Sequence, residues 1–179
     1  MQNLSEVDEA TRERQIGLLT ASFERALASL SAMRLNEGGR LEMVLSARLT
    51  EITGLVSTAE SSAALQPAAI KARLTELVKT LLDAVPALPE DRLAHEAALV
   101  IAKADVREEL DRLSAHIEAA RGLLNEGGAI GRRFDFLCQE FNREANTLCS
   151  KSADLELTRI GLALKAAIEQ MREQVQNIE

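Results

Sequence analysis

Apolar residues recur every three or four positions along most of this sequence, and that spacing constrains its fold more than any other feature. Leu41, Leu45, Leu49, Ile52 and Val56, for example, are separated by four, four, three and four residues. Residues at this spacing share one face of an α-helix, which has about 3.6 residues per turn. The same pattern predicts helices over residues 4–35, 41–56, 67–84, 90–124, 130–149 and 155–178.

The composition argues against the main all-β architectures. Aromatic residues make up 2% of the 179 residues, and the chain has only 9 Gly and 3 Pro. Strands favour aromatic and β-branched residues, and sandwiches and barrels need many turns. The sequence therefore predicts an all-α antiparallel bundle of five or six long amphipathic helices. Helices this long, with seam-like apolar faces, are also expected to oligomerise.

The string Leu-Asn-Glu-Gly-Gly occurs twice, at residues 35–39 and 124–128. Glycine tolerates the left-handed conformation that ends many helices, so both copies are predicted to end one. At the first copy a continuous helix is the alternative, at a cost of about 1 kcal/mol per glycine relative to alanine. Between the copies, residues 90–124 carry the longest uninterrupted helical pattern. Residues 150–154 are typical of a turn with a Ser or Asp cap.

Charge and cysteine usage limit the possible settings of the chain. Asp and Glu number 28 against 21 Lys and Arg, so any nucleic-acid contact must come from a local basic patch. No stretch approaches the roughly 18 apolar residues of a membrane span, and the first residues lack a secretion signal. Cys138 and Cys149 are too far apart on one helix to form a disulfide. We therefore expect free thiols, a cytoplasmic location and no membrane partner.

One candidate site lies on the predicted helix after Pro89. Asp105, Glu109, Arg112 and His116 are spaced by four, three and four residues, and Glu108 lies beside them. Carboxylates, a guanidinium and an imidazole in one row can hold a divalent metal or perform acid–base chemistry. The alternative is an exposed helix face carrying ion pairs between neighbouring turns.

A second polar stripe lies on the predicted helix over residues 130–149. Asp135, Gln139, Asn142 and Asn146 repeat the spacing of four, three and four. Amides and guanidinium groups can contact the bases and phosphates of a single strand. The alternative is a polar ladder that sets helix register in the bundle or at a subunit interface. The arginines that flank this stripe are Arg132, Arg133 and Arg143.

One phenylalanine of this helix departs from its apolar seam. Phe134 and Phe141 lie on the seam and are expected in the core, whereas Phe136 points away from it. An aromatic ring outside the core can serve as a platform for base stacking, so Phe136 is the exception among the phenylalanines.

Longer motifs in the second half of the chain resemble a known family. Residues 108–116 match the pattern EELDRLxxH, and residues 131–147 match GRRxDFLxQExNREANT. With Ser150–Ser152 and the ending Met171–Glu179, they resemble the C-terminal region of the YicC/YloC family of bacterial proteins. The resemblance is strong over residues 90–179 and weaker over the helical region 1–89, where residues 37–41 resemble the family pattern REGxxL.

This resemblance implies an endoribonuclease that acts on RNA, assembles as a homo-oligomer (a hexamer) and uses a divalent metal, Mn²⁺ or Mg²⁺. It implies that the helix runs through Glu37–Gly38, and that an additional N-terminal α/β domain precedes this region in family members. The family's polar motif positions overlap both stripes. We therefore predict catalytic roles for His116, Glu109 and Glu140, and metal ligation by Glu108, Glu109, Asp135 and Glu144. The predicted RNA contacts are Arg112, Arg132, Arg133, Gln139, Asn142, Arg143, Asn146 and Lys151.

A different class of function is compatible with the same residues. In that alternative the chain is a non-catalytic helical module, in which the apolar seams assemble subunits and the polar stripes set register between helices. Polar stripes that face solvent favour the enzyme, and polar stripes buried against other subunits favour the module.

Overall fold

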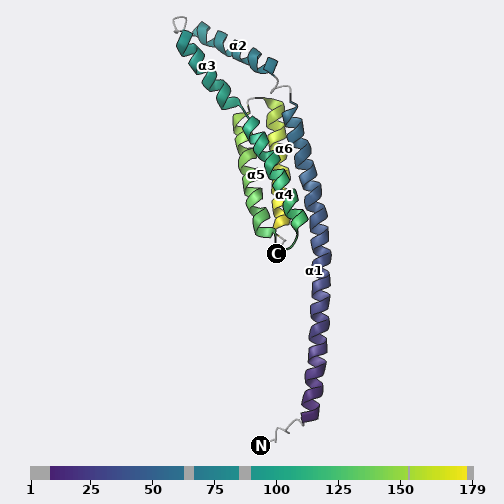
Figure 1. Ribbon diagram of the computed structural model, residues 1–179. Coiled ribbons are helices and arrows are strands. Elements are labelled where there is room, and N and C mark those ends of the chain that lie inside the picture. Colours follow the sequence, from purple (N-terminus) through teal and green to yellow (C-terminus); the bar gives the residue numbers. More distant parts are fainter. Residues whose placement is uncertain (1–8, 63–66, 85–89, 153, 177–179) are drawn as a thin grey trace, which may run out of the picture. The chain divides into compact units, whose positions relative to one another are not determined.

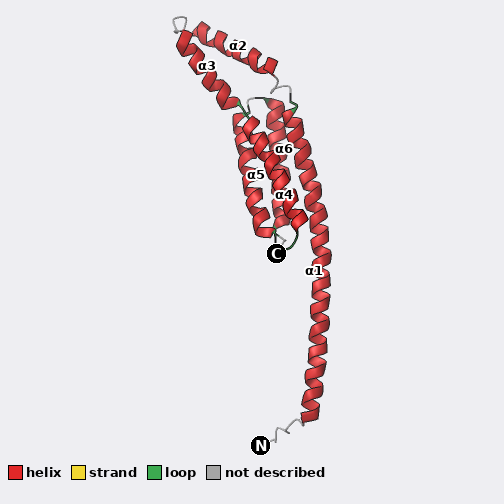
Figure 2. Cartoon of the chain, viewed as in Figure 1, coloured by secondary structure: helices red, strands yellow, loops and turns green. Residues whose placement is uncertain are grey.

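The computed structural model describes residues 9–62, 67–84, 90–152 and 154–176, and within them it contains six helices and no strand (Figure 1, Figure 2). The predicted all-α fold is confirmed. The predicted helix start at residue 4 lies outside the described residues. The helices are α1 (Glu9–Glu60), α2 (Pro67–Ala84), α3 (Glu90–Ala104), α4 (Arg107–Glu126), α5 (Gly131–Lys151) and α6 (Leu155–Val175).

The hydrophobic core is shared by four helices. The chain divides into two compact units within α1, after Glu42, and the core belongs to the second unit. Short connections make α4, α5 and α6 antiparallel neighbours along the bundle (Figure 1). Apolar residues of α1 after Met43 join the same core, and Arg121 on α4 donates a hydrogen bond to Thr53 on α1 at 3.1 Å. The apolar stripe from Leu45 to Val56 is therefore a core face, as the spacing predicts.

The two Leu-Asn-Glu-Gly-Gly strings adopt different conformations, and the prediction of a helix end at the first is wrong. Helix α1 continues through Gly38 and Gly39, which lack positive φ angles. At the second string Gly127 and Gly128 have φ angles of 68° and 74°, and α4 ends there. The chain must reverse at this point for α5 to pack on α4, and only the left-handed glycines allow so tight a turn. The tertiary contact decides which copy ends a helix.

The predicted continuous helix over residues 90–124 is also wrong, because it is interrupted between α3 and α4. Asp105 Oδ1 accepts a hydrogen bond from the backbone N–H of Arg107 at 3.0 Å, which replaces a helical partner of that N–H. The side chain of Val106 is fully buried at the interruption. Asp105 therefore precedes α4, although it shares the predicted spacing with Glu109.

The start of α6 follows the sequence prediction. Asp154 is its N-cap, and Asp154 Oδ1 accepts a hydrogen bond from the N–H of Leu157 at 2.9 Å. Both cysteines are free, as predicted. Burial raises the pKa of the Cys138 thiol to about 12, so this thiol stays protonated in the core. Cys149 is half-buried.

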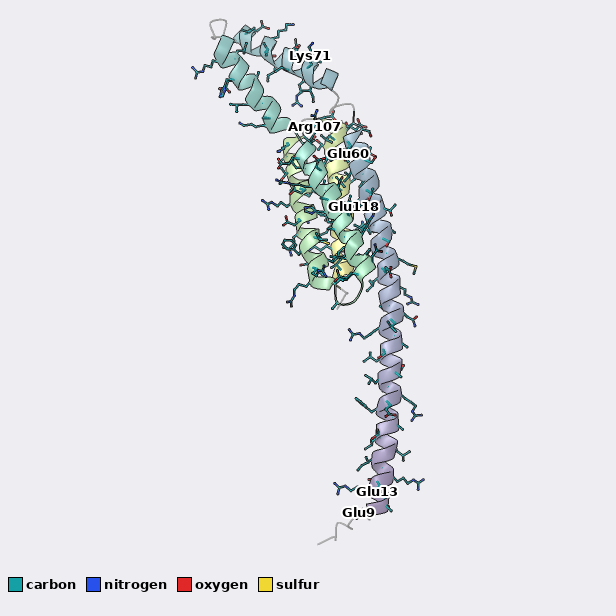
Figure 3. The ribbon with its side chains drawn as sticks, viewed as in Figure 1. Glu9, Glu13, Glu60, Lys71, Arg107 and Glu118 are labelled. Carbon is teal, nitrogen blue, oxygen red and sulfur yellow. The ribbon has the colours of Figure 1, made fainter. Side chains whose placement is uncertain are left out.

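No helix in the described part of the chain is long and apolar enough to cross a membrane. Charged residues instead cover the outer surface of the bundle. Glu118, labelled on α4 in Figure 3, forms an exposed ion pair with Arg121 at 2.8 Å.

The close approach of α5 and α6 gives a test of this packing. A Cβ atom added at Gly161 would lie 2.5 Å from Cys149 Sγ and 2.9 Å from Leu148 Cδ2, and Leu148 is fully buried. We expect Gly161→Ala to lower the free energy of unfolding by about 1–3 kcal/mol, measured by urea denaturation. Gly122→Ala on α4 is the matched control, because nothing lies within 4 Å of its added Cβ. The control should gain up to about 1 kcal/mol from helix propensity. Equal effects of the two substitutions would contradict this packing.

Candidate functional site

A row of polar side chains crosses the seam between α4 and α5. Helix α4 contributes Glu109, Arg112 and His116, which are spaced by three and four residues and therefore share one face. Helix α5 contributes Glu140, Glu144 and Lys151 from its edge facing α4. Since the helices are antiparallel, His116 lies opposite the carboxylates of Glu140 and Glu144, and Glu109 lies opposite Lys151.

Among the described residues, His116, Glu140 and Glu144 form a cluster of three possible metal ligands. One ligand atom from each lies within 4.8 Å of the other two. Glu144 is only 3% exposed, and the other two side chains are half-buried. The ring of Phe141 meets the His116 imidazole edge to face, with the centroids 5.7 Å apart and the planes at 74°. This contact limits the orientations that the imidazole can adopt.

The donor set of the cluster fits a divalent cation. His116 Nε2 is buried and has no hydrogen-bond partner in the described part of the chain, which is costly for a buried polar atom. Two carboxylates this close repel each other unless a positive charge lies nearby. One imidazole nitrogen with two carboxylate oxygens suits Mn²⁺ and related divalent ions. The residue types and their closeness are therefore compatible with a divalent cation at this position.

Arg112 lies at the edge of this cluster. Its Nη1 atom is 3.4 Å from Glu144 Oε1, and its Nη2 atom donates to Glu108 Oε1 at 2.5 Å. Half of the Arg112 side chain is exposed, so the guanidinium is held beside the cluster while still reaching solvent. Its charge partly balances that of Glu144, and its planar fork suits a phosphate.

Glu109 on α4 and Lys151 on α5 form a separate ion pair, nearer the start of α4 than the His116 cluster. Lys151 Nζ donates to Glu109 Oε1 at 2.7 Å and to the backbone oxygen of Asp105 at 3.1 Å. Glu109 is 3% exposed, and its Oε2 atom has no partner among the described residues. Lys151 therefore links the end of α5 to the start of α4. It also supplies the positive charge that balances the buried carboxylate of Glu109.

The opposite edge of α5 faces α6 and carries the second stripe. Asp135 accepts a hydrogen bond from Gln139 at 2.8 Å and pairs with Arg172 on α6 at 3.5 Å. Asn142 donates to Glu169, also on α6, at 3.5 Å. These bonds partly set the register of α5 against α6, as the polar-ladder interpretation expects.

A surface hollow of about 610 Å³ lies along the same edge. Four of its lining residues belong to the predicted RNA contacts, and two cations of α6 complete it. Lys165 and Arg172, which the sequence analysis did not single out, are seven residues apart and therefore share a face of α6. That spacing is the sequence signal that would have identified them. The lining residues are Gln139, Asn142, Arg143, Asn146, Thr147, Lys165 and Arg172.

The three arginines of α5 have different surroundings. Arg133 donates to Glu126 at 2.6 Å, and this bond lowers the pKa of Glu126 and raises that of Arg133. Arg133 thereby bridges the turn between α4 and α5. Arg143 is 3.9 Å from Glu140, and Arg132 is exposed with no ion pair in the described part of the chain.

The structure thus separates the predicted metal ligands. Glu144 joins His116 and Glu140, whereas Glu109 pairs with Lys151 and Glu108 with Arg112. Asp135 and Glu144 are nine residues apart, about half a turn around the helix, so they face α6 and α4 respectively. The four predicted ligands therefore do not lie together, whereas His116, Glu140 and Glu144 do.

Comparisons with known proteins support the family resemblance that the sequence motifs indicate. The family model described as "Endoribonuclease YicC-like, C-terminal" matches residues 59–179. A probable endoribonuclease YicC of Haemophilus influenzae is 41% identical over 162 residues, which cover 90% of this chain and 55% of that protein. A probable endoribonuclease YicC of Clostridioides difficile is 34% identical over 162 residues, with the same coverage of 90% and 55%.

The chain therefore spans about half the length of these curated relatives. The family model covers most of the chain, including both edges of α5 that carry the candidate site. On these matches, the chain belongs to the YicC-like endoribonuclease family, whose C-terminal region it contains.

Proposed function

We propose that this chain is the helical part of a metal-assisted endoribonuclease that cleaves single-stranded RNA. The observation that carries the proposal is the convergence of His116, Glu140 and Glu144 from two helices at the edge of the bundle. The relatives bear the name "Probable endoribonuclease YicC", which supports RNA as the substrate class.

We assign His116, Glu140 and Glu144 as the residues that hold the divalent cation. A bound Mg²⁺ or Mn²⁺ supplies a Lewis acid for a phosphodiester oxygen and lowers the pKa of a coordinated water. His116 is assigned to the metal rather than to proton transfer, because its ring nitrogen converges with two carboxylates and Phe141 restricts the ring. Arg112 is placed to bind the phosphate, since its exposed guanidinium lies beside Glu144.

The hollow between α5 and α6 is the proposed path of the RNA strand near this centre. Amides of Gln139, Asn142 and Asn146 offer both donors and acceptors for base edges, and Lys165 and Arg172 offer charge for phosphates. An acidic chain can use such a patch because contacts within a few ångströms outweigh the screened field of distant charges. Gln139 and Asn146 of the second polar stripe are exposed, which favours the enzyme over the helical-module alternative.

We assign Glu109 and Lys151 a structural role. Their bond joins α4 to α5 one layer from the metal ligands, so it holds the two helices in the register that brings Glu144 to His116. Glu109 is buried and already has a cationic partner, which makes it a poor ligand for a second cation.

We also propose that the chain assembles as a homo-oligomer, and the first unit supports this. Every residue from Glu9 to Arg40 on α1 is exposed. Ile16, Leu19, Phe23, Leu27 and Leu30 are spaced by three, four, four and three residues, so they form one apolar stripe. Helices in water gain most of their stability from packing such a stripe, so a copy of this chain is the proposed partner.

The metal assignment is tested with Glu140→Gln and Glu144→Gln, which keep the side-chain shape and remove the charge. We expect each to weaken Mn²⁺ binding at least about 10-fold by titration calorimetry, because each removes an anionic ligand. Cleavage of a labelled single-stranded RNA by the chain should require Mn²⁺ or Mg²⁺, stop in EDTA and fall with the same variants. Glu118→Gln is the control, since this exposed carboxylate lies elsewhere on α4. RNA that stays intact with the unmodified chain and metal would overturn the proposal for these residues.

The structural role of the Glu109–Lys151 pair predicts an asymmetric effect on stability. Lys151→Met should lower the free energy of unfolding by about 3 kcal/mol, because it leaves Glu109 buried without a counter-charge. The double variant Glu109→Gln, Lys151→Met should recover part of that loss in urea denaturation. Glu109→Gln alone should leave Mn²⁺ affinity unchanged. A loss of Mn²⁺ binding in a folded Glu109→Gln variant would instead place Glu109 among the ligands.

The assembly is tested by light scattering. We expect a mass above that of one 19.5 kDa chain, and Phe23→Glu should lower it by placing a charge in the apolar stripe. Leu18→Glu is the matched control, because Leu18 is also exposed on α1 but lies about half a turn from the centre of the stripe. A monomeric unmodified chain, or equal effects of the two variants, would contradict assembly through this stripe.

A further inference from the structure

Phe136 is an aromatic residue that the packing of the bundle does not explain. Its side chain is 60% exposed, whereas Phe134 and Phe141 on the same helix are fully buried. Single exposed apolar side chains are common on protein surfaces, so the exposure of this ring becomes informative only together with the charged and polar residues around it.

The residues around Phe136 indicate the chemistry of that partner. Arg132, Phe136, Gln139 and Arg143 follow at spacings of four, three and four, so they lie within about 60° of one another on α5 and span about 16 Å. We call this row the Phe136 stripe. Its members are all exposed, and Arg143 has only a long contact of 3.9 Å with Glu140. An aromatic ring between two available guanidinium groups is complementary to an unpaired base between two phosphates.

We propose that Phe136 is a stacking platform for one unpaired base of the RNA strand, with Arg132 and Arg143 contacting the phosphates on either side. This inference rests on the proposed function and adds a residue that selects its substrate. Duplex RNA keeps its bases stacked within the helix, so only an unpaired nucleotide can place its face on the ring. Phe136 thereby favours single-stranded over double-stranded RNA.

The position of Phe136 connects the stacked base to the proposed metal centre. Glu140 is four residues after Phe136, so the two side chains lie one turn apart on neighbouring parts of the α5 surface. In this proposal a nucleotide stacked on the ring would lie beside Glu140, which clusters with His116 and Glu144. On the other side, Gln139 and Arg143 belong both to the Phe136 stripe and to the lining of the hollow between α5 and α6.

The charge around the ring distinguishes RNA from a second copy of this chain as its partner. Arginine and phenylalanine occur at protein interfaces too, but the Phe136 stripe holds two guanidinium groups and no carboxylate, and an RNA strand offers a phosphate at every nucleotide. The exposed apolar side chains Leu155 and Leu162 belong to α6, so the stripe on α5 contains no exposed apolar residue besides Phe136.

The test compares Phe136→Ala, Phe136→Trp and the control Leu162→Ala, which removes a side chain of similar exposure, 57%, from α6. Binding of a fluorescein-labelled single-stranded RNA is measured by anisotropy in EDTA, so that no cleavage occurs. We expect Phe136→Ala to bind roughly 10-fold more weakly, as for the loss of one base stack. Phe136→Trp should retain the affinity, and Leu162→Ala should not change it. A 2-aminopurine base in the RNA should be quenched by the unmodified chain but not by Phe136→Ala.

Three other outcomes would overturn the inference in distinguishable ways. If the unmodified chain binds and cleaves RNA but Phe136→Ala binds within twofold of it, the stacking role fails and the proposed function stands. If Phe136→Ala lowers the mass in light scattering without changing RNA affinity, a second copy covers the ring. If the unmodified chain binds no single-stranded RNA, the stacking role and the proposed function fail together.

Discussion

The burial of one face of α5 sets the direction of the polar groups that this helix contributes to the candidate site. Phe134, Cys138, Phe141 and Leu148 are fully buried, so α5 cannot rotate about its axis without exposing them. With that rotation fixed, one edge of the helix turns Glu140 and Glu144 toward α4, and the other turns the amide stripe toward α6. Between the two edges the Phe136 stripe faces solvent. A packing constraint in the core thus arranges three polar surfaces around a single helix.

This arrangement is compatible with the proposed action on RNA, although the chain as a whole is acidic. The net charge of −7 opposes RNA at long range, but long-range fields are screened within about 8 Å at physiological salt. The proposed RNA contacts are local cations: Arg112 beside the His116, Glu140 and Glu144 cluster, Arg132 and Arg143 in the Phe136 stripe, and Lys165 with Arg172 in the hollow. Arg112 lies on α4, and Lys165 and Arg172 lie on α6. These cations come close to α5 only because the three helices pack together.

Sequence periodicity predicted the helices and the core stripes well, because burial enforces the same spacing that the sequence shows. It could not predict which Leu-Asn-Glu-Gly-Gly copy ends a helix, since that depends on whether a neighbour must pack after the turn. It also missed the interruption at Asp105, where a side chain replaces one backbone bond. For the site, the separation of Asp135 from Glu144 could have been predicted from the sequence, because nine residues correspond to about half a turn around a helix. The pairing of Glu109 with Lys151, 42 residues apart, came only from the packing of α4 on α5.

The proposed divalent-cation site consists of His116, Glu140 and Glu144, where α4 packs on α5. Anomalous diffraction from crystals of the chain soaked in Mn²⁺ tests it most directly, because the signal places the metal without assuming activity. We expect one strong peak within about 2.0–2.3 Å of an imidazole nitrogen of His116 and of carboxylate oxygens from Glu140 and Glu144. A peak bound instead by Glu109 or Asp135, or no peak at this seam at saturating Mn²⁺, would contradict the account.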